Sequence, residues 1–164
     1  QEGDFQLYGH ERVFESLKQR YSYIFETENK YPGAPSVEFN IIKNNIPFVI
    51  NNTQIIPINA LHASLQVFGF RIKNFVYLTD VKTISKEEIT KLKNTKVLVI
   101  NALRKEEHYS HFTLDEALSF IALVQPEKAY LTHVSHLLGF YEEVQKTLPK
   151  NVFLAHDNLT IELP

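Results

Sequence analysis

Residues 76–80 read Val-Tyr-Leu-Thr-Asp, a short apolar run that ends in a carboxylate. The second half of the chain shows the same arrangement three more times, with a polar residue directly after each apolar run. These pairs are 97–100 with Asn101, 129–132 with His133, and 152–155 with His156. Helical segments separate the runs, so the pattern predicts a βαβα alternation and a parallel sheet.

The polar residues that end these runs are candidates for a binding site. Ligands of α/β sheets bind at the carboxyl edge, where neighbouring loops converge. Asp80 and His133, delivered to one such edge, could hold a metal ion. An aspartate at a strand end also commonly begins a turn, so the spacing alone leaves both interpretations open.

The second half of the chain contains sequence signals for three helices. Ser85 with Glu88, and Thr113 with Glu116, have the spacing of capping boxes and predict helix starts. A third helix is expected over about 138–148, where Pro149 ends it.

The first half of the chain has a different pattern of apolar residues. Apolar residues at helical spacing predict an amphipathic helix over 10–25, and the Pro- and Gly-containing segment 26–36 predicts a loop. Residues 37–60 contain short β-branched and aromatic runs separated by Asn-Asn pairs, which favours antiparallel hairpin strands.

Composition bounds the class of protein. The 164 residues, 44% of them hydrophobic, suit a single domain with one core. A net charge of -2 disfavours nucleic acid and anionic membranes as partners. No run approaches the roughly 18 apolar residues of a membrane helix, and a signal pattern is missing, so a soluble cytoplasmic protein is expected. Since there is no cysteine, any metal must be held by His, Asp or Glu.

The histidines are informative only in context. His62 stands alone among apolar neighbours, and such a residue is more often a hydrogen-bonded core histidine than a ligand. The pairs His108 with His111, and His133 with His136, share a three-residue spacing. His108 and His111 precede the capping box at Thr113, which places them in a loop rather than on one helical face.

Four motifs occur in order along the chain. They are Leu78-Thr79-Asp80, Asn101-Ala102-Leu103-Arg104, His-Tyr-Ser-His-Phe-Thr-Leu-Asp-Glu-Ala at 108–117, and Leu-Thr-His-Val-Ser-His at 131–136. Together they resemble the metallo-β-lactamase superfamily, in particular the branch around the carbon–phosphorus lyase accessory phosphodiesterase. The ending 154–163 is similar as well, with Asn158 where that group more often has Gly.

The resemblance implies an αββα sandwich of two mixed sheets, in place of the simple parallel sheet that spacing alone suggests. By position, His62 matches a histidine on the first metal, Asp80 the aspartate that bridges both metals, and His133 the last histidine on the second metal. His111 matches a histidine beside the scissile phosphate, outside the metal shell. We therefore expect His62, Asp80 and His133 to converge at one edge of the fold, with two divalent ions, zinc or manganese, as cofactors. His108 and His136 are left as supporting or structural residues.

One departure from the family is large. Its His-x-His-x-Asp-His motif, which supplies most ligands of both metals, is absent from residues 1–164. In the family that motif lies upstream of the segment that matches residue 1 onward. The expectation is therefore one partial domain over 1–164 that lacks its N-terminal metal-binding segment and is inactive by itself.

The implied function is a metal-dependent phosphodiesterase that acts on a small cyclic or diester phosphate by two-metal activation of water. A lactamase is disfavoured, because several lactam-hydrolysing lines have a cysteine at the place of Asp80. A nuclease or RNA-processing member is disfavoured by the missing basic patch. The non-enzymatic alternative is a truncated or degenerate member that acts as a binding or assembly module, whose exposed sheet edges could pair with another copy in a homo-oligomer.

Overall fold

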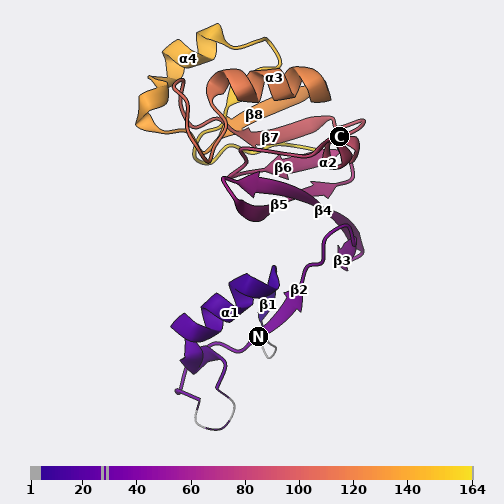
Figure 1. The fold of residues 1–164 in the computed structure, drawn as a ribbon, viewed down its shortest axis with the longest axis vertical. Helices are drawn as coiled ribbons and strands as arrows, with labels where there is room; N and C mark the ends of the chain where they lie inside the picture. Colours follow the sequence, from indigo (N-terminus) through magenta and orange to yellow (C-terminus); the bar gives the residue numbers. More distant parts are fainter. Residues whose placement is uncertain (1–4, 27, 29, 164) are drawn as a thin grey trace. The chain divides into compact units, whose positions relative to one another are not determined.

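A computed structural model describes residues 5–26, 28 and 30–163 of the chain. It divides into two compact units, Gln1–Ile46 and Pro47–Pro164, each with its own sheet (Figure 1).

The N-terminal unit is a βαβ arrangement. Strands β1 (Phe5–Gly9) and β2 (Val37–Ile41) pair in parallel, and α1 (Glu11–Arg20) and the 3₁₀ turn η1 (Ser22–Ile24) lie between them in sequence. Phe14 of α1 stacks on Phe39 of β2 with ring centroids 4.3 Å apart, which fixes the helix to the sheet.

Two expectations for the first half need correction. The helix expected over 10–25 ends at Arg20 and continues only as the 3₁₀ turn, with His10 as its N-cap. The strand at 37–41 is not part of a hairpin series, because it pairs in parallel with β1. A short run of β-branched and aromatic residues marks a strand but does not identify its partner.

The C-terminal unit is built on a seven-stranded mixed sheet in the order β3-β4-β5-β6-β7-β8-β9. The strands are β3 (Phe48–Ile50), β4 (Thr53–His62), β5 (Leu65–Ile72), β6 (Phe75–Leu78), β7 (Val97–Asn101), β8 (Lys128–Thr132) and β9 (Val152–Leu154). The pairs from β3 to β6 are antiparallel, and those from β6 to β9 are parallel. The parallel part confirms the alternation expected from the apolar runs.

The helices of this unit are α2 (Lys86–Thr90), α3 (Leu114–Val124) and α4 (Tyr141–Thr147), with the 3₁₀ turn η2 (His136–Leu138) before α4. The third expected helix therefore begins later than 138. Gly139 has φ 120°, a conformation that favours glycine and breaks the helical path before Tyr141. No helix in the described residues is both long and apolar enough to cross a membrane.

One face of the seven-stranded sheet carries the core. Its buried side chains form two rows across β6 to β9, which pack with side chains of α3 and α4. The rows are Val76, Leu98, Ala129 and Val152, and then Leu78, Ile100, Leu131 and Leu154. The second row includes Leu78 and Leu154, the last residues of β6 and β9, so the packed core extends to the carboxyl edge of the sheet.

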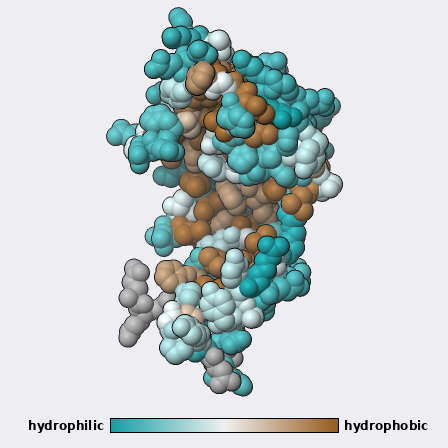
Figure 2. All heavy atoms as spheres, turned by 90° about the vertical axis from the view of Figure 1, so that its left-hand side faces the viewer, coloured by the Kyte–Doolittle hydropathy of each residue, from teal (hydrophilic) through white to brown (hydrophobic). Residues whose placement is uncertain are grey.

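The opposite face of the same sheet is rich in aromatic residues. A continuous register row crosses it from β5 to β9: Phe70, Tyr77, Val99, Tyr130 and Phe153. Val99 is buried, while Tyr77 is 40% exposed. Hydrophobic side chains also reach the surface elsewhere on this unit (Figure 2).

Only one of the two predicted capping boxes forms completely in the structure. Thr113 and Glu116 form the complete reciprocal box at the start of α3. Ser85 caps α2 by accepting a hydrogen bond from the amide of Glu88. The Glu88 carboxylate instead accepts from the amide of Asn59 on β4 at 2.7 Å and from the Lys91 ammonium at 2.6 Å. The Ser85–Glu88 motif thus joins α2 to β4 of the sheet.

Replacing Glu88 by alanine is expected to lower the free energy of unfolding by about 2–3 kcal/mol, because the half-buried amide of Asn59 and ammonium of Lys91 lose a buried, charged acceptor. Glu87→Ala, at the exposed neighbouring position of the same first turn, is the matched control and should have a much smaller effect. Urea unfolding followed by circular dichroism measures both. Equal stability of the two variants would contradict a joining role for Glu88.

Candidate active site

The strand directions bring the candidate residues to one edge of the C-terminal unit. Two antiparallel steps separate β4 from β6, so these strands run the same way, and β6 to β8 are parallel. His62 is the last residue of β4, Asp80 follows β6, and His133 follows β8. All three therefore leave the sheet at the carboxyl edge of the parallel strands, where α/β proteins bind ligands.

The side chains meet around Asp80. Its Oδ1 lies 3.2 Å from Nε2 of His111 and 3.4 Å from Nε2 of His133. The two Nε2 atoms are 3.1 Å apart. His62, Asp80 and His111 each offer a ligand atom, all within 4.8 Å of one another. The four residues, which we call the Asp80 cluster, thus join three imidazoles and one carboxylate.

Two members of the Asp80 cluster have left-handed backbones. Asp80 has φ 58° and His133 has φ 55°. This region is uncommon for residues other than glycine and costs of the order of 1–3 kcal/mol. At both positions it turns the chain sharply where the strand ends. Such strain persists only where surrounding contacts hold it, and it is concentrated at functional sites.

Asn101 supplies part of that support. Its fully buried side chain accepts a hydrogen bond from the amide of Val81 at 2.8 Å and donates one to the carbonyl of Val81 at 3.0 Å. The amide of Phe112 donates to the same carbonyl at 2.9 Å. Because Val81 follows Asp80 and Phe112 follows His111, this backbone network fixes both side chains relative to β7.

We expect Asn101→Asp to lower the free energy of unfolding by about 2–4 kcal/mol, because a buried carboxylate would face the Val81 carbonyl with no proton to donate. Asn158→Asp, at an exposed position in the same unit, should have little effect. Thermal unfolding of both variants, monitored together with the wild type, provides the measurement. If Asn101→Asp unfolds at nearly the wild-type temperature, the hydrogen bonds between Asn101 and Val81 do not stabilise the site.

His111 is the buried member of the Asp80 cluster, 8% exposed. Burial lowers its pKa from the usual histidine value, and the neighbouring imidazoles of His62 and His133 act in the same direction. The hydrogen bond and charge of Asp80 oppose this shift. The neutral imidazole of His111 is therefore favoured to a lower pH than in an exposed histidine.

The donor set of the Asp80 cluster suits a divalent ion. Nitrogen and carboxylate oxygen atoms are the ligands of zinc and manganese sites that lack cysteine. When His111 is neutral, two imidazole nitrogens at 3.1 Å and a carboxylate oxygen converge on one small volume. A neutral imidazole has one ring nitrogen with a free lone pair, which can bind a cation.

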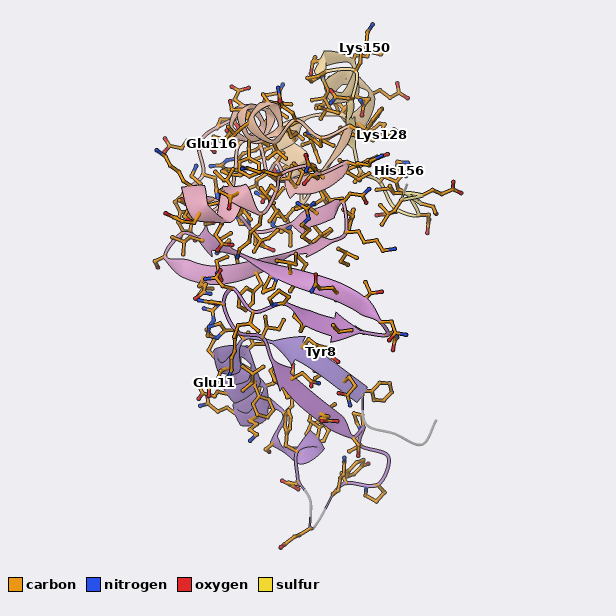
Figure 3. All side chains as sticks on the ribbon, turned by 90° about the vertical axis from the view of Figure 1, so that its right-hand side faces the viewer. Tyr8, Glu11, Glu116, Lys128, Lys150 and His156 are labelled. Carbon is orange, nitrogen blue, oxygen red and sulfur yellow. The ribbon has the colours of Figure 1, made fainter. Side chains whose placement is uncertain are left out.

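The other candidate histidines lie in different surroundings. His136 is exposed on η2, and His156 is on the loop after β9, where its ring packs against Tyr141. Figure 3 shows His156 and Glu116, at the start of α3, on opposite sides of the C-terminal unit in that view. Sequence reasoning missed Ser110, a buried hydroxyl that contacts both His108 and His111. Only its position inside the His-x-x-His spacing could have pointed to it.

Comparison with known proteins identifies the family. The model of the Beta-lactamase superfamily domain matches residues 1–134, and the chain belongs to this superfamily. The chain is also similar to a crystal structure of a diphosphatase from the PhnP family, with a TM-score of 0.88 and 28% identity over 99% of this chain. These findings confirm the metallo-β-lactamase-like fold and the resemblance to its phosphodiesterase branch.

Two other proteins are similar to this chain. The metallo-β-lactamase fold protein YhfI of Bacillus subtilis, 15% identical over 99% of this chain with a TM-score of 0.72, shares the fold. An octanoyltransferase of Porphyromonas gingivalis is 32% identical over 154 residues, 93% of this chain. The chain spans 60% of the diphosphatase, 67% of YhfI and 31% of the octanoyltransferase.

Proposed function

We propose that the protein containing this chain is a metal-dependent hydrolase, specifically a phosphodiesterase that acts on a small cyclic or diester phosphate. The observation that carries the proposal is the convergence of three imidazoles on Asp80 at the carboxyl edge of the sheet, in a chain of this superfamily. Similarity to a diphosphatase, an enzyme named for phosphate chemistry, supports phosphorus as the reacting centre.

In this proposal His62, Asp80 and His133 would hold the metal, and the Asp80 carboxylate would serve both ions. Divalent ions at such a site would activate a water molecule and neutralise charge that develops on the phosphoryl oxygens. Zinc and manganese both accept this ligand set, and the choice between them stays a prediction.

His111 is assigned to the substrate side. As the leaving-group oxygen departs, the Nε2–H bond of His111 breaks and an O–H bond forms, while the P–O bond breaks and its electron pair goes to the oxygen. This general-acid step removes the need to expel an alkoxide. The Asp80 cluster also allows His111 to act as a ligand, and turnover measured together with metal content separates the two roles.

The ligand count points to a contribution from outside residues 1–164. A site with two ions shared through Asp80 would leave each ion with about two ligands from His62, Asp80 and His133, whereas catalytic zinc has three. We propose that a segment with a His-x-His-x-Asp-His motif supplies the rest. The partly exposed aromatic row on the sheet is consistent with a partial sandwich, in which a second sheet would cover that face.

Residues 1–164 by themselves are therefore expected to bind at most one ion, weakly. Elemental analysis after dialysis against zinc or manganese measures this, with anomalous scattering to locate any ion. Two ions at full occupancy on this chain, or ions held by Glu or His outside the Asp80 cluster, would contradict the ligand assignment.

The activity itself is tested on the natural protein that contains this chain. The metal-free protein is loaded with Zn²⁺ or Mn²⁺ and assayed with bis(p-nitrophenyl) phosphate, a cyclic phosphodiester and a diphosphate ester. Hydrolysis that requires metal and is lost in EDTA is the expected result. A fully loaded protein that hydrolyses none of these compounds would overturn the proposal and favour a binding or assembly module. A small-molecule substrate and a cytoplasmic location stay predictions from the sequence.

A further inference from the structure

We propose that α4 closes the β9 edge, the side of β9 that faces away from β8, and that Gln145 is the residue that keeps this edge from pairing with another strand. Neither a second copy of the chain nor a strand of a partner protein can then extend the seven-stranded sheet beside β9. The inference concerns assembly and does not depend on the proposed hydrolase activity.

The register of β9 shows which of its backbone groups face this edge. β9 is the last strand of the sheet, and in the described part of the chain it pairs with β8 alone. The amide of Ala155 donates to the carbonyl of Leu131 and therefore points toward β8. Because alternate residues of a strand direct their N–H and C=O groups to opposite neighbours, those of Val152 and Leu154 point away from β8.

Each of these outward backbone groups has a partner in α4 or in the turn that follows it. Nε2 of Gln145 donates to the carbonyl of Val152 at 3.0 Å, and Oε1 of Gln145 accepts from the amide of Leu154 at 2.7 Å. The amide of Val152 donates to the carbonyl of Pro149 at 2.9 Å. The hydroxyl of Tyr141 donates a long bond of 3.5 Å to the carbonyl of Leu154.

The side-chain amide of Gln145 occupies the place of a neighbouring strand. A strand added in parallel would donate an N–H to the carbonyl of Val152 and accept a bond from the amide of Leu154. A primary amide carries the same kinds of donor and acceptor as the backbone, so Gln145 fills both positions at once. β9 is a wholly apolar run, Val152–Leu154, and open edges of apolar strands are sites of self-association. Gln145 thus protects the edge that most needs cover in this part of the sheet.

Sedimentation velocity of the natural protein over a range of concentrations tests the proposal. Gln145→Met keeps the length of the side chain and removes both hydrogen bonds. We expect its weight-average mass to rise about twofold or more above that of the wild type as the concentration increases, because a second copy can pair with the open edge. Lys146→Met, at the exposed neighbouring position of α4, adds the same apolar side chain and leaves the edge closed, so its mass should match the wild type.

Gln145→Glu separates an open edge from a general loss of stability. Its carboxylate can still accept from the amide of Leu154 but cannot donate to the carbonyl of Val152, so this variant also loses stability. The negative charge at the edge opposes an incoming strand, and the variant should keep the wild-type mass. Association of Gln145→Glu to the same extent as Gln145→Met, or an unchanged mass of folded Gln145→Met, would overturn the proposal.

Hydrogen exchange provides a readout that does not require any variant to associate. In the wild type the amide of Leu154 should exchange slowly, as hydrogen-bonded amides inside a sheet do. In Gln145→Met, at a concentration too low for association, it should exchange about 10-fold or more faster. Rapid exchange of this amide in the wild type would show that the edge is open, and would overturn the proposal even if Gln145→Met failed to fold.

Discussion

Replacing Asp80 by asparagine is expected to lower kcat for phosphodiester hydrolysis by at least about 10³-fold in the natural protein. The change keeps the size of the side chain and removes its negative charge, so the residue can no longer neutralise or bridge two cations. Metal ions supply several kcal/mol of transition-state stabilisation, and about 1.4 kcal/mol corresponds to a tenfold change in rate.

Metal content is the accompanying measurement for Asp80→Asn. Under the proposed function two ions share this carboxylate, so we expect less than one ion per protein in Asp80→Asn against two in the wild type. Asp115→Asn, at an exposed position in the first turn of α3, is the matched control and should keep both metal and rate. Full metal occupancy and normal turnover in Asp80→Asn would remove Asp80 from the site.

His111→Ala is expected to lower kcat by about 10²-fold or more while bound metal stays near stoichiometric. That magnitude is usual for the loss of a general acid. The measurement is decisive because the structure permits two roles: His111 faces Asp80 at 3.2 Å as a hydrogen-bonding partner and also belongs to a set of atoms that could hold an ion.

The comparison that separates the two roles is rate against metal content. His136→Ala serves as the control for the loss of an imidazole from this region. Loss of metal from the His111 variant would make His111 a ligand and overturn its assignment as a general acid. Retained metal with an unchanged rate would show that neither role is needed.

Much of the fold could be predicted from local sequence patterns. The apolar runs at 76–79, 97–100 and 129–132 correspond to the parallel strands β6 to β8, and Thr113 with Glu116 marks the start of α3. These features depend on neighbours a few residues apart, and for that reason composition and spacing reveal them. The same patterns could not pair the strand at 37–41, which joins β1 instead of a hairpin.

The candidate site was also only partly predictable from the sequence. The resemblance drew attention to His62, Asp80, His111 and His133, and the structure places all four together. Their roles stay predictions. The residues that support them were not recognisable, because Asn101 holds Val81, and Glu88 holds Asn59, through contacts between distant segments.

The sequence by itself therefore determined the strand and helix signals, the superfamily and the candidate residues that could bind metal. Only the tertiary structure decided that β4 runs in the same direction as β6, so that His62 reaches the same edge as Asp80. It also decided that the Nε2 atoms of His111 and His133, which lie far apart in the sequence, come within 3.1 Å of each other. The physical reason is that propensity and spacing act over one or two turns of chain, whereas strand pairing and side-chain contacts depend on which distant segments meet.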